Sequence, residues 1–247
     1  MGEKTVRLVL EYDGSRYFGW QRQREEPTIQ GTLEEAIHRM TGEISSLIAS
    51  GRTDAGVHAL HQVCHFRTYT ETSPGALKKG LNALTPRDIF VKDVQVVPRD
   101  FHARYSARSK TYEYRVLNRP DPNVFMRAYT WHVPHALDFE AMKACMDILL
   151  DRHDFTSFRS SGSTNINPER EMMRSELHRS DEEHLRFVFE ADGFLRHMVR
   201  NIVGTVIEVG RRRFSFEEFT EILLARDRRR AGTMAPPHGL YLTMVTY

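Results

Sequence analysis

Segments of alternating hydrophobicity and segments of helical period are interspersed along the whole chain, without a regular strand–helix–strand repeat. Alternation of apolar and polar residues predicts strands with one buried face, and an apolar residue every three to four positions predicts amphipathic helices. A regular repeat would indicate a parallel sheet with helices on both faces. Its absence predicts an α+β fold, with antiparallel sheets and helices on one face.

The predicted elements fall into two halves of similar pattern. In the first half we expect strands over 6–12, 62–69 and 89–97, helices over 28–40 and 74–84, and a short apolar segment at 46–50. In the second half we expect strands over 111–117, 172–178, 184–190 and 239–247, and helices over 138–150, 194–209 and from 215 onward. Asp138 suits an N-cap, and Ser215 with Glu218 has the spacing of a capping box. We therefore predict an N-terminal α+β subdomain over 1–107 and a C-terminal α+β subdomain over 108–247.

Length and composition limit the class of protein. The 247 residues are 40% hydrophobic and 28% charged, and no apolar run approaches the roughly 20 residues that span a bilayer. The N-terminal segment lacks the pattern of a signal peptide. Cys64 and Cys145 are the only cysteines, which argues for a reducing compartment and against a disulfide framework. We expect a cytoplasmic protein with no membrane partner.

Arginines occur in local groups, although the net charge of +2 does not by itself indicate a nucleic-acid binder. Most such groups are solvated faces. The groups are Arg16, Arg22 and Arg24; Arg104 and Arg108; Arg211, Arg212 and Arg213; and Arg228, Arg229 and Arg230.

The predicted helix over 194–209 has an apolar stripe and, on a different face, Arg196 and Arg200 one turn apart. Such a helix can line a cleft that holds an anionic backbone. It can equally be a surface helix with exposed arginines, and the local pattern alone favours the surface helix.

The segment 51–56 places Arg52, Thr53 and Asp54 between Gly51 and Gly56, directly after a short apolar stretch. Glycine permits positive φ and close backbone approach, so we expect a tight loop that presents its central side chains. A carboxylate beside a cation stays ionised, as a nucleophile or general base requires. The alternative is a structural turn in which Asp54 caps the loop and pairs with Arg52, and the local pattern slightly favours this turn.

The nine residues GRTDAGVHA at 51–59 resemble the signature of the TruA family of tRNA pseudouridine synthases, in which the aspartate is catalytic. Further segments resemble the family in the same order, from Tyr12 to Leu242. These segments are YDG at 12–14, GWQRQ at 19–23, TIQGTLE at 28–34, LNAL at 81–84, FHAR at 101–104, KTYEYR at 110–115, FL at 194–195, MVRNIVG at 198–204, APP at 235–237 and GLYL at 239–242.

Two segments depart from the family pattern. Phe18 stands where the family often has histidine, and the strand 61–67 reads HQVCHFR where the family usually has GQVAHFD. Neither change touches the catalytic positions that the resemblance implies. They concern substrate preference and local packing.

The resemblance implies a pseudouridine synthase fold, in which two similar α/β subdomains with antiparallel sheets join around a central RNA-binding cleft. It implies that Asp54, as nucleophile or base, isomerises uridine to pseudouridine with no cofactor or metal. Arg52 would fill the space of the flipped base or hold a phosphate, and Tyr112 would stack on the uracil. The alternative for Tyr112 is an ordinary core aromatic. Whether Asp54 attacks the sugar, attacks the base or removes a sugar proton stays open.

The resemblance also implies the substrate and the assembly: the anticodon stem-loop of tRNA, at positions 38, 39 and 40, bound across a homodimer. Basic side chains would contact phosphates and make binding salt-dependent. The candidates are Arg16, Arg22, Arg24, Arg104, Arg108, Lys110, Arg196 and Arg200, of which Arg200 is the one we place among the substrate-binding residues.

Three other functions compete with this interpretation. A zinc site would use His58, His61, Cys64 and His65, but on a strand His61 and His65 share one face while Cys64 points to the other. A non-catalytic tRNA-binding or folding protein would not need the intact signature. A retaining glycosidase would need a second carboxylate as acid, and no other glycine-framed loop provides one.

Overall fold

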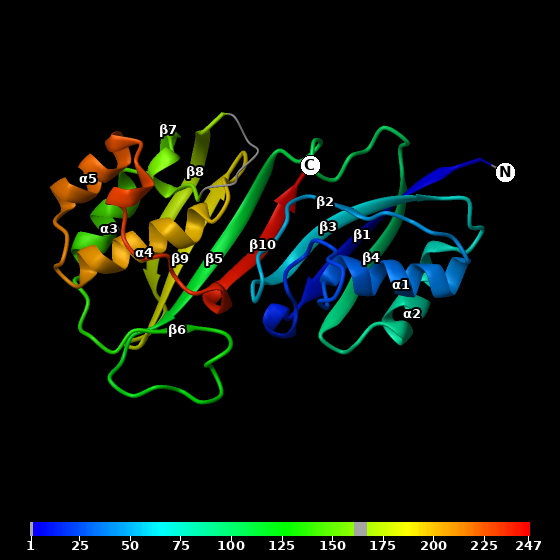
Figure 1. Cartoon of the computed structure of the whole chain (residues 1–247), viewed down its shortest axis with the longest axis horizontal. Helices are drawn as coiled ribbons and strands as arrows, with labels where there is room; N and C mark the ends of the chain where they lie inside the picture. Colours follow the sequence, from blue (N-terminus) through cyan, green and yellow to red (C-terminus); the bar gives the residue numbers. More distant parts are fainter. Residues whose placement is uncertain (1, 161–166) are drawn as a thin grey trace. The chain divides into compact units, whose positions relative to one another are not determined.

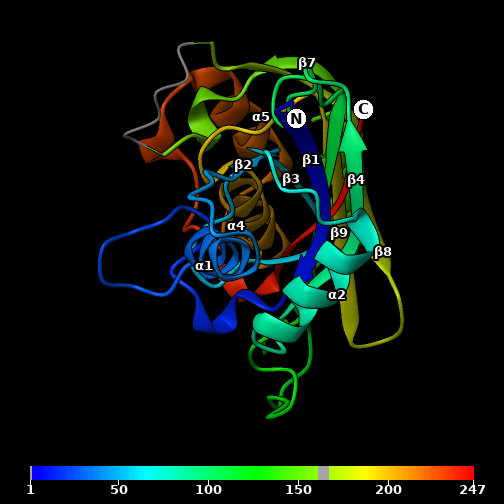
Figure 2. The same cartoon turned by 90° about the vertical axis from the view of Figure 1, so that its right-hand side faces the viewer.

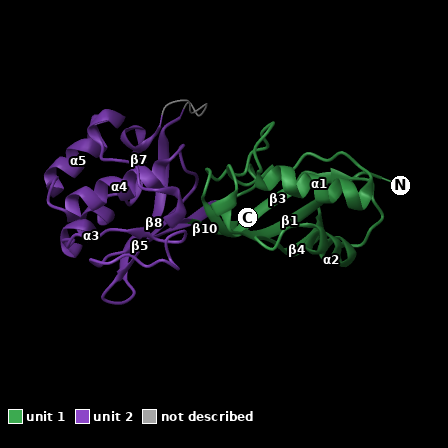
Figure 3. Ribbon diagram, turned by 60° about the horizontal axis from the view of Figure 1, so that its bottom comes forward, with its two compact units in different colours: residues 1–108, 241–247 green, residues 109–240 purple. Residues whose placement is uncertain are grey.

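The computed structural model describes residues 2–160 and 167–247, which form two compact units. Unit 1 comprises Met1–Arg108 and Tyr241–Tyr247, and unit 2 comprises Ser109–Leu240 (Figure 3). The predicted boundary after residue 107 assigned the C-terminal strand to the second half, but this strand packs in unit 1. It pairs there with a strand about 180 residues earlier, and hydrophobic pattern carries no information on such pairing.

Unit 1 is built on strands in the order β4-β1-β3-β10. Strand β1 (Lys4–Tyr12) runs antiparallel to β3 (His58–Thr68) and to β4 (Ile89–Val97), and the short β2 (Ile48–Ala49) adds to β3. Strand β10 (Leu240–Thr246) runs parallel to β3, with Tyr241 opposite His58. The sheet of unit 1 is thus mostly antiparallel.

Two helices complete unit 1, α1 (Ile29–Thr41) and α2 (Pro74–Leu84). They lie next to each other, and α2 lies against β4 (Figures 1 and 2). Leu8 of β1, Leu33 of α1 and Leu81 of α2 are fully buried in the resulting core. The side chains of Thr28 and Ser73 cap the two helices by accepting backbone N–H groups of the first turn.

Unit 2 has an antiparallel sheet with the order β5-β9-β8-β7. Its strands are β5 (Ser109–Leu117), β9 (His184–Ala191), β8 (Glu169–Arg179) and β7 (Asp151–Asp154), and β6 (Trp131–His132) pairs in parallel with β5. Helices α3 (Phe139–Asp147), α4 (Met198–Gly210) and α5 (Phe216–Ala225) pack together, and α3 lies against β8 (Figure 1).

Charged side chains cover the other face of the unit 2 sheet. Glu113 of β5 pairs with Arg115 and with Arg186 of β9. On β8, Glu176 pairs with Arg174 and His178. Helices therefore occupy one face of this sheet and ion pairs the other, which confirms the predicted α+β class.

Helix α4 differs from the expected surface helix. All 13 of its residues are buried, and Arg200 is only 7% exposed. The helix also begins later than position 194, because His197 has the left-handed φ of 61° and acts as its N-cap. A Cβ on Gly204 would lie 1.8 Å from the Thr233 carbonyl oxygen, so the chain near Thr233 passes directly against the helix. The expectation of exposed arginines on both turns is wrong for Arg200, because this side chain is buried and its Nε donates to the Ala235 carbonyl.

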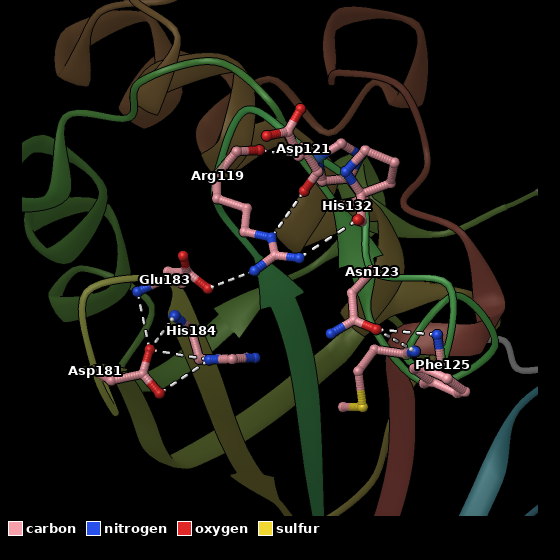
Figure 4. Close-up of polar contacts among 10 residues, drawn as sticks. Arg119, Asp121, Asn123, Phe125, His132, Asp181, Glu183 and His184 are labelled. Carbon is pink, nitrogen blue, oxygen red and sulfur yellow. Dashed lines mark hydrogen bonds and ion pairs between the residues drawn. The ribbon is translucent and has the colours of Figure 1, made fainter.

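Contacts of Arg119 hold the segment between β5 and β6, residues 118–130, in place (Figure 4). The Arg119 guanidinium donates to the Asp121 carbonyl at 2.8 Å and lies 3.0 Å from a Glu183 carboxylate oxygen, at the turn between β8 and β9. The carbonyl of Arg119 is hydrogen-bonded to His132 at 2.8 Å. These contacts fasten this segment to the sheet of unit 2.

Within residues 2–160 and 167–247, none of the helices has the length and hydropathy of a membrane span.

Candidate active site

The glycine-framed segment forms the loop between β2 and β3 of unit 1. Gly56 has a φ of 76°, and the Val57 N–H donates to the Asp54 carbonyl at 3.1 Å, which closes a tight turn. Thr53 is buried, Asp54 is half-buried and Arg52 is exposed. The loop therefore presents Asp54 and Arg52 to solvent while the residue between them points inward.

The segment 14–20 forms a backbone wall against this loop. The Trp20 N–H donates to the Thr53 carbonyl at 3.0 Å, and the Gly56 N–H donates to the Tyr17 carbonyl at 3.2 Å. Gly19 has a φ of 86°, and a Cβ there would lie 2.7 Å from the Thr53 carbonyl oxygen. This close approach explains why glycine occupies position 19.

His58 and Gly14 connect the end of the loop to the wall. The His58 ring is buried, its Nδ1 accepts the Gly14 N–H at 3.1 Å, and the ring stacks on Tyr241 of β10 at 4.7 Å. A Cβ on Gly14 would lie 2.0 Å from the Val57 carbonyl oxygen. These contacts hold His58, the first residue of β3, in place between the wall and the last strand.

The residues considered for a zinc site have other surroundings. His65 accepts the Ala103 N–H at 3.1 Å, and burial together with His102 and Arg67 lowers the pKa of His65 to about 4. Burial raises the pKa of the Cys64 thiol. Over the described ranges, no three His, Cys, Asp or Glu side chains are grouped as metal ligands.

Arg52 extends from the loop without an intramolecular polar contact. In the part of the chain that the structure describes, its guanidinium makes no hydrogen bond and no ion pair. The pair between Arg52 and Asp54, which the sequence left open, is therefore not formed in this structure. A solvated guanidinium two residues from a carboxylate is available to an anionic ligand.

Tyr112 and Arg200 lie in unit 2. Tyr112 of β5 is 8% exposed, and its ring meets the Phe194 ring edge-on at 4.9 Å. Tyr114 lies on the same face of the strand, and its buried hydroxyl donates to the Pro236 carbonyl at 2.7 Å. Burial raises the pKa of Tyr114, while the positive charge of Arg200 opposes this shift. The structure thus brings Arg200 close to the face of β5 that carries Tyr112.

Backbone contacts fix Arg200 within unit 2. Its Nε donates to the Ala235 carbonyl at 2.8 Å, and the Ala235 N–H donates to the Arg200 carbonyl at 3.0 Å. Arg196, one turn earlier, is exposed. Arg196 and Arg200, which the sequence grouped together, therefore have different surroundings. Of the predicted site residues, Asp54 and Arg52 lie on one loop of unit 1.

Sequence reasoning gave no role to several residues that hold the loop, chiefly Tyr12, Ser50 and Gln62. Gln62 is a polar residue inside an otherwise largely buried strand, and this pattern is the signal that could have identified it. Its partners outside β3 lie on two separate segments, at Tyr12 of β1 and at Ser50 and Gly51, so their contacts could not be read from spacing.

Comparison with known proteins matches these residues to one family. A family model described as tRNA pseudouridine synthase matches residues 8–106 and 148–247, which include the loop, the wall and α4. Several similar curated proteins are named tRNA pseudouridine synthase A. One from Acetivibrio thermocellus is 44% identical over 244 residues (99% of this chain and 100% of that protein). One from Geobacillus sp. strain WCH70 is 44% identical over 245 residues (99% and 98%), and one from Erythrobacter litoralis is 42% identical over 241 residues (97% of each). The chain belongs to the tRNA pseudouridine synthase family.

Proposed function

We propose that this protein isomerises uridine to pseudouridine in tRNA and that Asp54 is its catalytic residue. The observation that carries the proposal is the loop itself: a half-buried carboxylate on a backbone held from two sides, in a family of tRNA pseudouridine synthases. In the reaction the nitrogen–carbon glycosidic bond breaks, a carbon–carbon glycosidic bond forms, and a proton lost from carbon is balanced by one gained at nitrogen. The nucleoside is rearranged internally, so the overall balance requires no oxidant and no second substrate.

The target base must leave the RNA stack before it can reach a carboxylate, at a cost of a few kcal/mol. Asp54 then acts as nucleophile or base on the nucleoside. The aromatic ring of Tyr112 suits stacking on a flipped uracil, and the solvated Arg52 suits a phosphate or the space that the base vacates. Arg200, held by the Ala235 carbonyl, adds a fixed positive charge near the Tyr112 face of β5.

The finer assignments follow from the family resemblance. We expect uridines 38, 39 and 40 of the anticodon stem-loop as targets, a homodimer as the working assembly, and the cytoplasm as the compartment that holds the substrate. Anticodon stem-loop transcripts with a single uridine at each position test the first assignment, and sedimentation of purified protein tests the second. Turnover of uridines elsewhere in tRNA, with none at 38–40, would overturn the positional assignment.

The decisive test of the proposal is Asp54→Asn. This variant keeps the side chain's shape but removes its charge, so we expect no detectable pseudouridine while the affinity for tRNA stays within a few-fold of wild type. The matched control is Asp100→Asn, at an exposed aspartate of unit 1, which should leave turnover unchanged. Pseudouridine is measured in tRNA incubated without added cofactor or metal, and persistent turnover by Asp54→Asn would refute the assignment.

A further inference from the structure

A buried polar network lies directly under the Asp54 loop, within unit 1. Gln62 and Ser50 are fully buried, and Tyr12 and Thr53 are 4% and 6% exposed. The four side chains come from β1, from the loop and the residue before it, and from β3. Buried polar groups are costly unless each finds a partner, so the pattern of their hydrogen bonds is informative.

The side-chain amide of Gln62 uses all of its hydrogen-bonding capacity. Its oxygen accepts from the Ser50 hydroxyl at 2.8 Å and from the Val63 N–H at 3.2 Å. Its nitrogen donates to the Gly51 carbonyl at 2.9 Å and to the Tyr12 hydroxyl at 3.3 Å. A flipped amide would set NH₂ against the Val63 N–H and oxygen against the Gly51 carbonyl, so only one orientation is compatible with these neighbours.

The Tyr12 hydroxyl, which accepts from Gln62, also shares a hydrogen bond with the Thr53 hydroxyl, and either hydroxyl can be its donor. Because the Tyr12 oxygen accepts from Gln62, the Tyr12 proton is free to point at the Thr53 hydroxyl oxygen, 2.8 Å away. Burial raises the pKa of Tyr12 to about 12, so the phenol keeps this proton at neutral pH. The chain of hydrogen bonds runs from Gln62 through Tyr12 to Thr53, the residue covalently joined to Asp54.

Thr53 is consequently held from both sides. The Trp20 N–H donates to its carbonyl from the outer wall, and the Tyr12 hydroxyl binds its side chain from the core. Two residues earlier, Gln62 binds the Gly51 carbonyl. The backbone before Asp54 is thus fastened at two points, and neither fastening involves Asp54 or Arg52 themselves.

We propose that Tyr12 and Gln62 are positioning residues that fix where Asp54 meets the target nucleoside, an inference that rests on the proposed function. They act through Thr53 and Gly51 and touch no substrate. Misplacement of a catalytic group by about 1 Å can cost on the order of a hundredfold in rate. The network should therefore control the rate of the chemical step and leave tRNA affinity alone.

The test compares Tyr12→Phe, Thr53→Val and the double variant, because each single change removes the same hydrogen bond. We expect each to lower the single-turnover rate about tenfold or more, with the dissociation constant for tRNA unchanged within about twofold. The double variant should be no slower than the slower single variant, since the bond can be lost only once. Thr53→Ser keeps the hydroxyl and should regain most of the rate that Thr53→Val loses.

The rate is measured with enzyme in excess at saturating concentration, where it does not depend on the fraction of protein that is folded. Tyr247→Phe is the matched control: its partly buried hydroxyl donates to the Ala103 carbonyl at 2.8 Å, also in unit 1, and its loss should leave the rate unchanged. Full rate in Tyr12→Phe, additive losses in the double variant, or an equal loss in Tyr247→Phe would each overturn the inference. If wild type forms no pseudouridine, the proposed function fails. If wild type is active, Asp54→Asn is inactive and Tyr12→Phe keeps the wild-type rate, only the positioning role fails.

Discussion

Two sets of arginines in this chain differ in what their charges meet. The loop arginines lie on or near the wall and the Asp54 loop of unit 1. They are Arg16, Arg22, Arg24 and Arg52. The C-terminal arginines lie in two runs of unit 2, after α4 and after α5. They are Arg211, Arg212, Arg213, Arg228, Arg229 and Arg230.

The C-terminal arginines meet partners within unit 2. Arg211 and Arg213 both pair with Glu208, at 3.3 and 3.0 Å. Arg212 pairs with Asp138. In the second run Arg228 is half-buried and donates to the Asn201 side chain at 2.9 Å, while the other two residues pair with Asp227 and Glu221. These runs look basic in the sequence, but each of their guanidinium groups has an acceptor within unit 2.

The loop arginines make fewer ion pairs and hydrogen bonds within the described residues. Arg22 pairs with Glu34 at 3.0 Å, but its side chain is 63% exposed, and Arg16 only reaches Asp88 at 4.0 Å. Arg24 and Arg52 make no polar contact among the residues that the structure describes. The comparison teaches that the density of arginines along a sequence does not locate an anion site. The number of unmatched guanidinium groups around a fixed loop is the better guide.

Among the arginines, the largest effect is expected from Arg52→Gln. A hydrogen bond between charged groups contributes about 1.5–3 kcal/mol, so kcat/KM for tRNA should fall roughly 10- to 100-fold. The melting temperature should not change, because Arg52 makes no polar contact elsewhere in the described ranges. Arg213→Gln is the control from the other set and should retain kcat/KM. A fall in melting temperature with normal turnover would place Arg52 among the structural arginines instead.

A smaller effect is expected on the salt dependence of tRNA affinity, which should differ between variants of the two sets. Each lost phosphate contact reduces the slope of log affinity against log salt by about 0.7–0.9. We expect this reduction for Arg24→Gln and no change for Arg212→Gln, although the Arg212 side chain is 83% exposed. Filter binding of tRNA between low and moderate salt measures both slopes. Equal slopes in the two variants would remove the distinction between the sets.

Local signals predicted most of the helices and strands. Thr28, Asp138 and Ser215 each accept a backbone N–H at a helix start, and Ser215 with Glu218 forms the capping box that their spacing predicted. Capping depends on residues three apart, so the sequence contains the whole interaction. The short strands β6 and β7 were not predicted, because two to four residues give no measurable alternation.

Interactions between distant segments set the limit of prediction at the site. The signature pointed to Asp54 and Arg52 as candidates, but the environment of Arg200 depends on the carbonyl of Ala235, thirty-five positions away. The bond between Tyr12 and Thr53 spans forty-one positions, and that between Tyr12 and Gln62 spans fifty. Such partners are chosen by the packing of β1 against β3, and no local period encodes this packing.

The smallest effect concerns Asp227, whose pair with the exposed Arg229 tests whether the C-terminal charges are matched. The side chain of Arg229, helped by its backbone N–H, lowers the pKa of Asp227 from about 3.8 to about 2. A carboxyl with a lowered pKa stabilises the folded state above pH 3.8, and this contribution is lost as the pH falls through about 2. In Arg229→Gln the pKa should rise part of the way to 3.8, since the backbone N–H still donates. An NMR titration of the Asp227 carboxyl measures the shift, and it should shrink in high salt because both groups face solvent. A pKa that stays near 2 in the variant would show that the backbone N–H alone lowers the pKa of Asp227. The Arg229 guanidinium would then be unmatched, like those of the loop arginines.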